Sequence, residues 1–235
     1  IPTTLLSMTD ASVGGKTGIN LGHVKNAVGT FADPLAIMIH PGFLTTLHPD
    51  ELRSGFAEML KHGLIASADH WHQVCSAMVH GELNDELVLE SAMIKWHIAE
   101  KDPEEKAGRR LLNFGHTFGH ALESVMLENR SPVTHGDAVA AGMVAEVILS
   151  RMKGLLPDPQ AEVIVADLLR LFPIQELFAI DFERLWSYMV HDKKAVHGIQ
   201  KITLLRGAGH ALHGQACTVP EISAAWENAR NLVNG

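Results

Sequence analysis

The sequence predicts a mainly α fold, in which a helical domain with a small C-terminal β-hairpin follows a short α/β segment. From residue 46 onward, apolar residues recur at helical spacing between stop signals, whereas residues 1–45 hold short apolar runs among glycines and prolines. Near the C-terminal end, two apolar segments flank Gly207 and Gly209, a pattern typical of a hairpin. We therefore divide the chain into residues 1–45 and residues 46–235.

The N-terminal segment is predicted to contain one buried strand. Leu35-Ala-Ile-Met-Ile39 is a continuous apolar run between Pro34 and Pro41, as expected for a strand inside a sheet. Upstream of this run, the pair Gly14-Gly15 predicts a tight turn that presents Lys16.

The glycine-rich stretch before Lys16 does not fit a nucleoside triphosphate-binding loop. That motif requires a glycine five positions before Gly15, and the residue there is Asp10, whose carboxylate would repel phosphate. The alternatives are an anion-binding turn, in which Lys25 and Asn26 assist Lys16, and an ordinary solvated loop.

Six helices are predicted after residue 46. The first begins at Pro49, which forms a typical first turn with Asp50 and Glu51. Later helices end just before a glycine or a proline. Their predicted ranges are 69–79, 84–101, 116–126, 136–153 and 161–171. A hairpin formed by residues 201–205 and 211–219, and a last helix from Pro220 to about Val233, complete the predicted fold.

Composition limits the possible functions. The chain has 235 residues, of which 46% are hydrophobic, enough for a substantial core. A run of about 18 apolar residues, as a membrane span requires, is absent, and we expect a cytoplasmic protein. The net charge of -8 argues against a nucleic-acid partner. Cys75 and Cys217 form no CxxC motif, so a metal ion would take nitrogen and oxygen ligands.

Histidines in an apolar, glycine-spaced context are the strongest candidates for a site. His116 and His120 are four residues apart, so on one helix they lie along a common stripe and could share a metal ion. His135 begins a second polar cluster and is a third candidate. A single histidine would more often be a polar residue satisfied by hydrogen bonds, but the combination favours a metal site.

Glu58 offers the carboxylate that such a site would need. It lies three residues before Lys61, and the simplest interpretation is a surface ion pair, which would stabilise the helix by only a few tenths of a kcal/mol. Because its neighbours are apolar, Glu58 could instead join two imidazoles from other helices in a three-ligand zinc site with an open position.

Six separated segments, in order, make the chain resemble the 3-dehydroquinate synthases. They comprise residues 2–20, which contain Ser12-Val-Gly-Gly-Lys-Thr-Gly18, the pair Lys25-Asn26, Ser54 to Lys61, Leu111 to Ala121, His135 to Met143, and Asp192-Lys-Lys194. The resemblance implies that residues 1–45 are the tail of an α/β nucleotide-binding domain and that residues 46–235 form a helical metal-binding and substrate-binding domain.

The resemblance also implies an activity and its cofactors. Enzymes of this family convert 3-deoxy-D-arabino-heptulosonate 7-phosphate to 3-dehydroquinate and phosphate, a step of the shikimate pathway in aromatic amino acid biosynthesis. They use catalytic NAD and a divalent metal, Zn or Co. The implied partner is therefore a small anionic sugar phosphate, and the full-length protein is expected to be a homodimer.

Site residues follow from the resemblance by position. The metal ligands would be Glu58, His116 and His135, which leaves His120 to face the substrate. The substrate-binding positions would be Lys16, Lys25, Asn26, Lys61, Lys95, Arg109, Asn113, His120 and Lys193. The positions near NAD would be Thr3, Thr4, Asp10, Lys16, Lys25, Thr46 and Leu47.

Three other functions remain open at this point. The chain could belong to another sugar phosphate cyclase, to a metal-dependent polyol dehydrogenase, or to a non-catalytic metal-binding fragment. The cluster of lysines argues against an uncharged polyol as substrate. Because the chain opens abruptly at Ile1 and lacks the family's glycine-rich NAD-binding segment, we expect a C-terminal portion that is inactive by itself.

Overall fold

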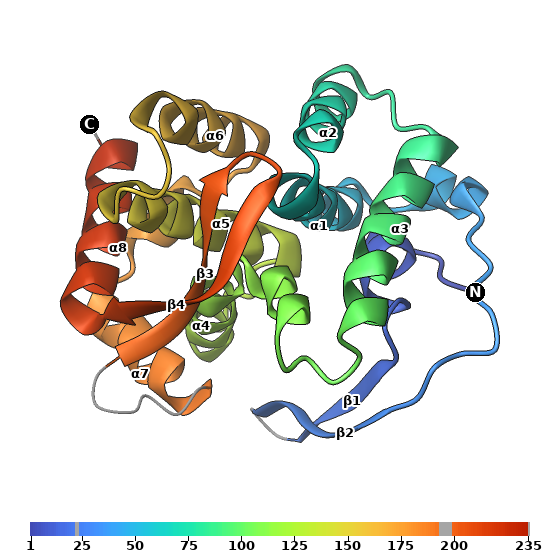
Figure 1. The fold of residues 1–235 in the computed structure, drawn as a ribbon, viewed down its shortest axis with the longest axis horizontal. Coiled ribbons are helices and arrows are strands. Elements are labelled where there is room, and N and C mark those ends of the chain that lie inside the picture. The colour runs from blue at the N-terminus through green and yellow to red at the C-terminus, as the bar shows by residue number, and fades with distance from the viewer. Residues whose placement is uncertain (22–23, 193–198, 235) are drawn as a thin grey trace.

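The computed structural model describes residues 1–21, 24–192 and 199–234, and it describes the backbone alone for residues 20, 21, 24–27, 191, 192 and 234. The predicted mainly α fold with a small C-terminal hairpin is confirmed (Figure 1). The α-helices are α1 (Pro49–Ala66), α2 (Ala68–His80), α3 (Asp85–Lys101), α4 (His116–Glu128), α5 (His135–Met152), α6 (Asp158–Leu171), α7 (Phe182–Asp192) and α8 (Val219–Asn234).

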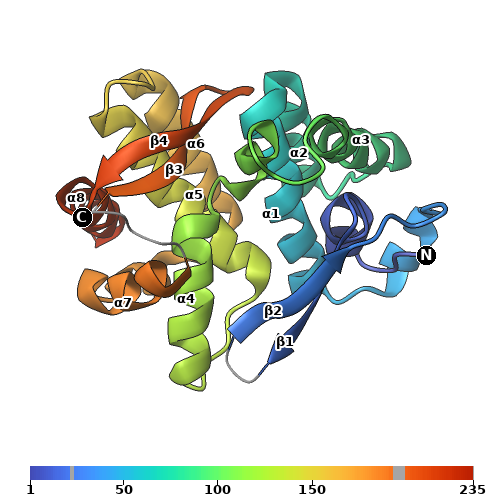
Figure 2. The same ribbon diagram turned by 60° about the horizontal axis from the view of Figure 1, so that its bottom comes forward.

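Four strands and four short helical turns complete the described fold. The strands form two antiparallel pairs, β1 (Lys16–Leu21) with β2 (Val24–Phe31) and β3 (Ile199–Gly207) with β4 (His210–Thr218). The turns are η1 (Ser7–Ala11), η2 (Pro41–Thr46), η3 (Gly108–Asn113) and η4 (Gln175–Ala179). The β1–β2 hairpin lies at the edge of the molecule in both ribbon views (Figures 1 and 2).

Helix α5 is the centre of the fold. Every residue from Gly136 to Ser150 is buried, and apolar side chains surround the helix on all sides, which is typical of a helix enclosed by others. Helices α1, α4, α6 and α8 and strand β3 pack against it. The first residue of α5, His135, therefore lies at the end of a helix that is buried from Gly136 to Ser150.

Glycines allow two helices to approach α5 closely. A Cβ atom on Gly142 would lie 1.9 Å from the carbonyl oxygen of Gly115, directly before α4. A Cβ atom on Gly136 would lie 2.3 Å from the Cα atom of Ser54 on α1. These distances leave no room for a side chain, so the contacts of α4 and α1 with α5 depend on glycine.

The predicted strand at residues 35–39 is wrong. These residues have no regular secondary structure, Leu35 is fully exposed and Met38 is largely exposed. A strand requires a neighbour for its backbone N–H and C=O groups, and among the described residues none pairs with this segment. The predicted turn at Gly14-Gly15 is present, with φ angles of 97° and 66°, and it leads into the β1–β2 hairpin, which the sequence analysis missed.

The six predicted helices, the C-terminal hairpin and the last helix are confirmed. Helix α2 ends at Gly81 with φ 72°, and Gly154 after α5 has φ 67°, the left-handed conformation expected of glycine after a helix. Leu5 and Met8 pack into the same core as the helices. The division of the chain at residue 45 stays a prediction.

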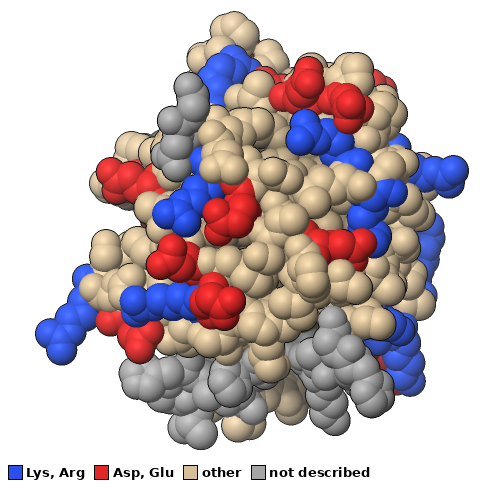
Figure 3. Space-filling view, turned by 90° about the vertical axis from the view of Figure 1, so that its left-hand side faces the viewer, with Lys and Arg blue, Asp and Glu red and all other residues tan. Residues whose placement is uncertain are grey.

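Acidic and basic side chains are intermixed on the left-hand side of the molecule, and neither sign dominates the face shown in Figure 3. None of the helices in the described residues is both long enough and apolar enough to cross a membrane.

The close crossing of α4 and α5 predicts an unusual effect of Gly142→Ala. In an exposed helix interior this change would stabilise the protein by about 1 kcal/mol, because alanine has the higher helix propensity. Here the new methyl group would collide with the backbone at Gly115, so we expect destabilisation by about 1–3 kcal/mol. Urea unfolding at equilibrium measures the difference.

Gly108→Ala is the matched control, because no atom lies within 4 Å of the position that its methyl group would take and its φ is not in the left-handed region. The free energy of unfolding of Gly108→Ala should stay within about 0.5 kcal/mol of the wild-type value. A Gly142→Ala variant that is as stable as the wild type would contradict the tight crossing.

Candidate metal and anion site

Three helices bring together the carboxylate of Glu58 and the imidazoles of His116 and His135. Glu58 lies in the middle of α1, while His116 and His135 are the first residues of α4 and α5. His135 Nε2 lies 3.2 Å and His116 Nε2 lies 3.5 Å from Glu58 Oε1. One donor atom of each residue lies within 4.8 Å of those of the other two, close enough to share an ion.

The chemistry of these donors fits a divalent metal such as zinc. Two imidazole nitrogens and one carboxylate oxygen are a common three-ligand set that leaves a coordination position open. Glu58 is fully buried, whereas the side chains of His116 and His135 are partly exposed, so the open side faces away from α1. The second ring nitrogens also have partners: His116 Nδ1 lies 3.1 Å from Phe114 O, and His135 Nδ1 lies 3.4 Å from Glu123 Oε1.

The two imidazoles differ in their electrostatic surroundings. Burial lowers the pKa of His116 well below its usual value, and the nearby charges of Lys61 and His135 lower it further. Burial would also lower the pKa of His135, but hydrogen bonds to the carboxylates of Glu123 and Glu58 outweigh it and raise the pKa to about 10. Without a metal ion, His135 therefore supplies positive charge between two carboxylates, and a metal ion would replace its proton.

His120 lies beside this cluster but not within it. Its ring centroid is 5.2 Å from that of His116 and 6.4 Å from that of His135. Spacing along α4 thus brings His116 and His120 together, as predicted, yet the donor atoms that converge are those of His116, His135 and Glu58.

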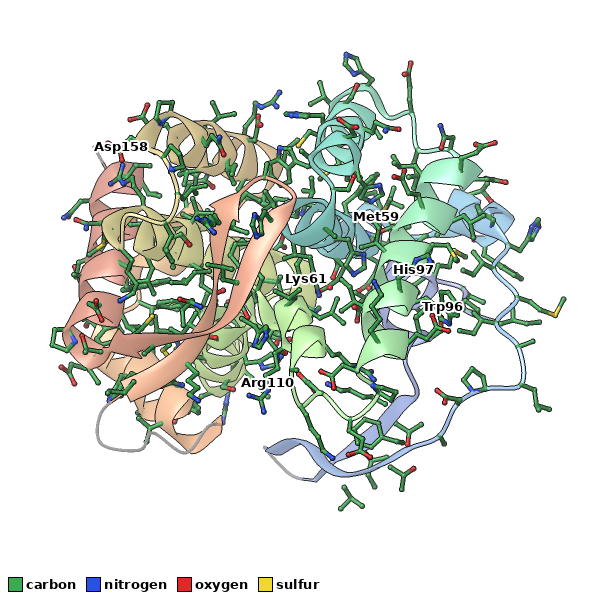
Figure 4. The ribbon with its side chains drawn as sticks, viewed as in Figure 1. Met59, Lys61, Trp96, His97, Arg110 and Asp158 are labelled. Carbon is green, nitrogen blue, oxygen red and sulfur yellow. The ribbon has the colours of Figure 1, made fainter. Side chains whose placement is uncertain are left out.

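Buried lysines adjoin the cluster on the side of α1 and α3. Lys61 is fully buried near the centre of the molecule (Figure 4) and forms ion pairs with Glu58 and, at 3.7 Å, with Asp10 Oδ1. Lys95 on α3 reaches the same Asp10 oxygen at 2.8 Å. The interpretation of Glu58 and Lys61 as a surface ion pair is therefore wrong, because neither side chain is exposed.

Charge balance sets the protonation states of this group. Burial would raise the pKa of Asp10, but the attraction of Lys95 and Lys61 holds it well below its usual value. Burial would likewise raise the pKa of Glu58, yet the charge of Lys61 lowers it. Asp10, Glu58 and His62 also lie within reach of one another, but there the carboxylate oxygen of Asp10 already has two ammonium partners, Lys61 and Lys95.

A second set of polar contacts joins residues 14–16, at the start of β1, to the loop before α4. Lys16 and Asn113 both bind the carboxylate of Glu105, Asn113 Nδ2 at 2.7 Å from Oε1 and Lys16 through Oε2. Arg109 is buried and donates to Gly14 O at 2.5 Å and to Pro103 O at 2.8 Å. Three of the predicted substrate-binding residues, Lys16, Arg109 and Asn113, thus lie in two neighbouring segments, residues 14–16 and 102–113.

Glu105 is a candidate site residue that the sequence analysis missed. Its backbone has φ 57°, a left-handed conformation that is uncommon for a residue with a side chain. Asp102 stabilises this loop, because its carboxylate accepts hydrogen bonds from the backbone N–H groups of Lys106, Ala107 and Arg109. The signal available in the sequence was the pair Glu104-Glu105 after Pro103, which is also typical of an ordinary solvated loop.

Four further predicted residues, Thr3, Thr4, Thr46 and Leu47, form no hydrogen bond or ion pair with the cluster among the described contacts. Thr3 and Thr46 are exposed, and Thr4 and Leu47 are half-buried. The side chains of Lys25 and Asn26 and the whole of Lys193 lie outside the described residues. Their roles stay predictions.

Comparison with known proteins identifies related sequences over the whole site. Residues 1–54 match the family model described as 3-dehydroquinate synthase N-terminal, and residues 55–195 match that described as 3-dehydroquinate synthase C-terminal. The chain is 42% identical to 3-dehydroquinate synthase of Parabacteroides distasonis over 226 residues, which are 94% of this chain and 64% of the relative. It is 36% identical to the Enterococcus faecalis enzyme over 90% of this chain and 59% of the relative.

Two solved structures share the fold. The first is ValA (2-epi-5-epi-valiolone synthase) from Streptomyces hygroscopicus subsp. jinggangensis 5008 with NAD⁺ and Zn²⁺ bound, with a TM-score of 0.81 and 29% identity over 98% of this chain and 65% of that protein. The second is 2-deoxy-scyllo-inosose synthase complexed with carbaglucose-6-phosphate, NAD⁺ and Co²⁺, with a TM-score of 0.80 over 97% of this chain and 66% of that protein. Its identity of 21% shows the fold alone.

The buried ion pairs predict that Lys61 contributes strongly to stability. In the metal-free protein, Lys61→Met would remove the ammonium partner of the buried Glu58 and leave it the imidazole of His135, and removal of one partner of such a buried pair costs about 3–5 kcal/mol. Urea unfolding in the presence of a chelator measures this cost. Lys106→Met is the control, because Lys106 and its partner Glu104 are both largely exposed and their pair should contribute less than about 1 kcal/mol. Equal effects of the two changes would contradict the burial of the Lys61 pair.

Proposed function

This chain belongs to the 3-dehydroquinate synthase family, and on that premise we propose that its protein converts 3-deoxy-D-arabino-heptulosonate 7-phosphate to 3-dehydroquinate and phosphate. The chain spans 64% of the length of its Parabacteroides distasonis relative, so the activity is proposed for the protein that carries the chain. The observation that carries the proposal is the pair of buried cations, Lys61 and Lys95, next to a carboxylate and two imidazoles that can share an ion.

We propose that Glu58, His116 and His135 hold a divalent metal, zinc or cobalt. When bound, this ion would supply a Lewis acid that polarises an oxygen atom of the substrate. The converging donor atoms support this assignment, as do the solved relatives, one with Zn²⁺ and another with Co²⁺ bound. The open position of the three-ligand set is where a substrate oxygen would enter.

We also propose that NAD binds beside the N-terminal segment and supplies a hydride acceptor. The proposed contacts are Thr3, Thr4, Asp10, Lys16, Lys25, Thr46 and Leu47. Asp10 links this group to the metal cluster, because it forms ion pairs with both Lys61 and Lys95. Both solved relatives have NAD⁺ bound, which supports the proposal.

The side chains of the chain itself would bind and orient a doubly anionic substrate. The substrate carries a phosphate and a carboxylate, and positive charge comes from Lys61 and Lys95 next to Asp10, from Arg109 next to Gly14, and from Lys16. Asn113, which binds Glu105 together with Lys16, would add an amide hydrogen-bond donor. Lys25, Asn26 and Lys193 are proposed as further substrate contacts.

His120 is suited to move protons. His120 lies next to the proposed ligand His116, where its imidazole can exchange a proton with a hydroxyl group of the substrate. Glu105 lies between Lys16 and Asn113; burial would raise its pKa, but the hydrogen bonds that these two residues donate lower it, so Glu105 is suited to hold the two donors in place. A homodimer, a cytoplasmic location and a place in the shikimate pathway stay predictions.

The activity is tested on the complete encoded protein supplied with NAD and zinc. We expect phosphate release from the heptulosonate 7-phosphate that requires NAD, disappears with a chelator and returns when zinc is added. A heptulose 7-phosphate without the carboxylate is the control substrate. Equal phosphate release from both substrates would favour another sugar phosphate cyclase, and no release from either would contradict the proposed activity.

The metal ligands predict a specific order among histidine variants. His116→Ala and His135→Ala each remove one of three ligands, so we expect both purified variants to lose bound metal as measured by elemental analysis. His120→Ala is the matched control, because it removes a neighbouring imidazole on the same helix and should keep the metal. Loss of metal by His120→Ala, with retention by His135→Ala, would show that the ligand assignment is wrong.

A further inference from the structure

Glu146 is a buried carboxylate that the proposed reaction does not use. It lies on α5, eleven positions after His135, and is fully buried within a helix whose other buried residues are mostly apolar. A carboxylate in such a place is strongly destabilising unless hydrogen-bond donors compensate for its lost hydration. The hydrogen-bond donors around Glu146 therefore explain how its carboxylate can be buried.

Two donors to Glu146 are backbone N–H groups at the start of α4. Gly115 N lies 2.7 Å from Glu146 Oε2, and Thr117 N lies 3.3 Å from Glu146 Oε1. The first N–H groups of a helix have no partner within the helix, and the residue before it usually supplies a side chain to accept from them. That residue is Gly115, which has no side chain, so Glu146 serves as the cap from a different helix.

The capped residues lie on either side of His116. Gly115 and Thr117 precede and follow it, so the backbone of His116 is held from both sides by one carboxylate. The negative charge of Glu146 also interacts favourably with the positive end of the α4 dipole. On its other side, His116 directs Nε2 toward Glu58 Oε1 at 3.5 Å.

The spacing of α4 and α5 makes this contact inflexible. The crossing at Gly142 brings Gly115 so close to α5 that no methyl group would fit between them. Glu146 follows Gly142 by one turn of the same helix, and His135 begins that helix. One rigid element thus supplies one proposed ligand directly and holds the other through Glu146.

We propose that Glu146 is a positioning residue of the metal site, which sets metal affinity by fixing the backbone of His116. The inference rests on the proposed ligands Glu58, His116 and His135. Partners that orient metal ligands typically contribute 10-fold to 100-fold to metal affinity. A glutamine at this position would keep the shape but lose the charge and one acceptor, and would place a donor near an N–H group.

The test compares zinc affinity in wild type, Glu146→Gln and Glu221→Gln, by competition with a chromophoric chelator at a temperature where circular dichroism shows all three to be folded. Glu221 is the matched control, because it also accepts a backbone N–H, that of Thr218 at 2.7 Å, next to the start of α8 and outside the metal cluster. We expect the zinc dissociation constant of Glu146→Gln to rise at least 10-fold and that of Glu221→Gln to stay unchanged.

Cobalt provides a second readout that loss of stability alone would not change. The visible absorption spectrum of bound Co²⁺ reports coordination geometry, and we expect it to differ between wild type and Glu146→Gln but not between wild type and Glu221→Gln. Glu146→Asp, which keeps the charge but retracts it by one methylene, is expected to have a dissociation constant between those of wild type and Glu146→Gln. It takes the place of Glu146→Gln if the latter does not fold.

The outcomes separate this inference from the proposed function. A wild-type protein that binds neither zinc nor cobalt would remove the proposed metal site and this inference together. A wild-type protein that binds metal, with Glu146 variants that bind equally tightly and give the same cobalt spectrum, would overturn the role of Glu146 alone.

Discussion

The cost of removing a charge from water is the constraint on which the centre of this structure depends. Glu58 and Glu146 are both fully buried, and a buried carboxylate must be compensated by cations or by hydrogen-bond donors. Glu58 is compensated by ion pairs with Lys61 and with the imidazole of His135. Glu146 is compensated by hydrogen bonds from backbone N–H groups at the start of α4. Each carboxylate thereby fixes where another helix begins, and those beginnings carry the candidate metal ligands.

The ends of α4 and α5 are held in place by contacts from neighbouring helices. The bidentate pair of Arg53 with Asp137 and the hydrogen bond from Gly136 N to Ser54 Oγ, 2.9 Å long, join the start of α5 to α1. Glycines at both crossings let backbones approach where side chains could not. Together these contacts join α1, α4 and α5 directly to one another.

Around this support, positive side chains are balanced by internal carboxylates. Asp10 binds Lys61 and Lys95, and Glu105 binds Lys16 and Asn113. A chain with a net charge of -8 can still bring several lysines and arginines together in one region, because internal carboxylates offset their mutual repulsion. The same arrangement keeps two buried ammonium groups compatible with folding, since each faces a carboxylate at close range.

The sequence by itself determined the helices, because their periodicity, first-turn prolines and terminal glycines are local signals, as at Pro49, Gly81 and Gly154. It also determined the pairing of His116 with His120, since a spacing of four residues places two side chains on one stripe. The resemblance of separate segments to one family pointed to Glu58, His116 and His135, whose meeting no local spacing predicts. Only the tertiary structure decided that their donor atoms converge, that Glu58 and Lys61 are buried together, and that Glu105 and Glu146 reach partners far along the chain. It also decided that residues 35–39 form no strand. The physical reason is common to all of these: an apolar run becomes a strand only beside a partner, and a charge becomes buried only where distant segments supply its counterpart.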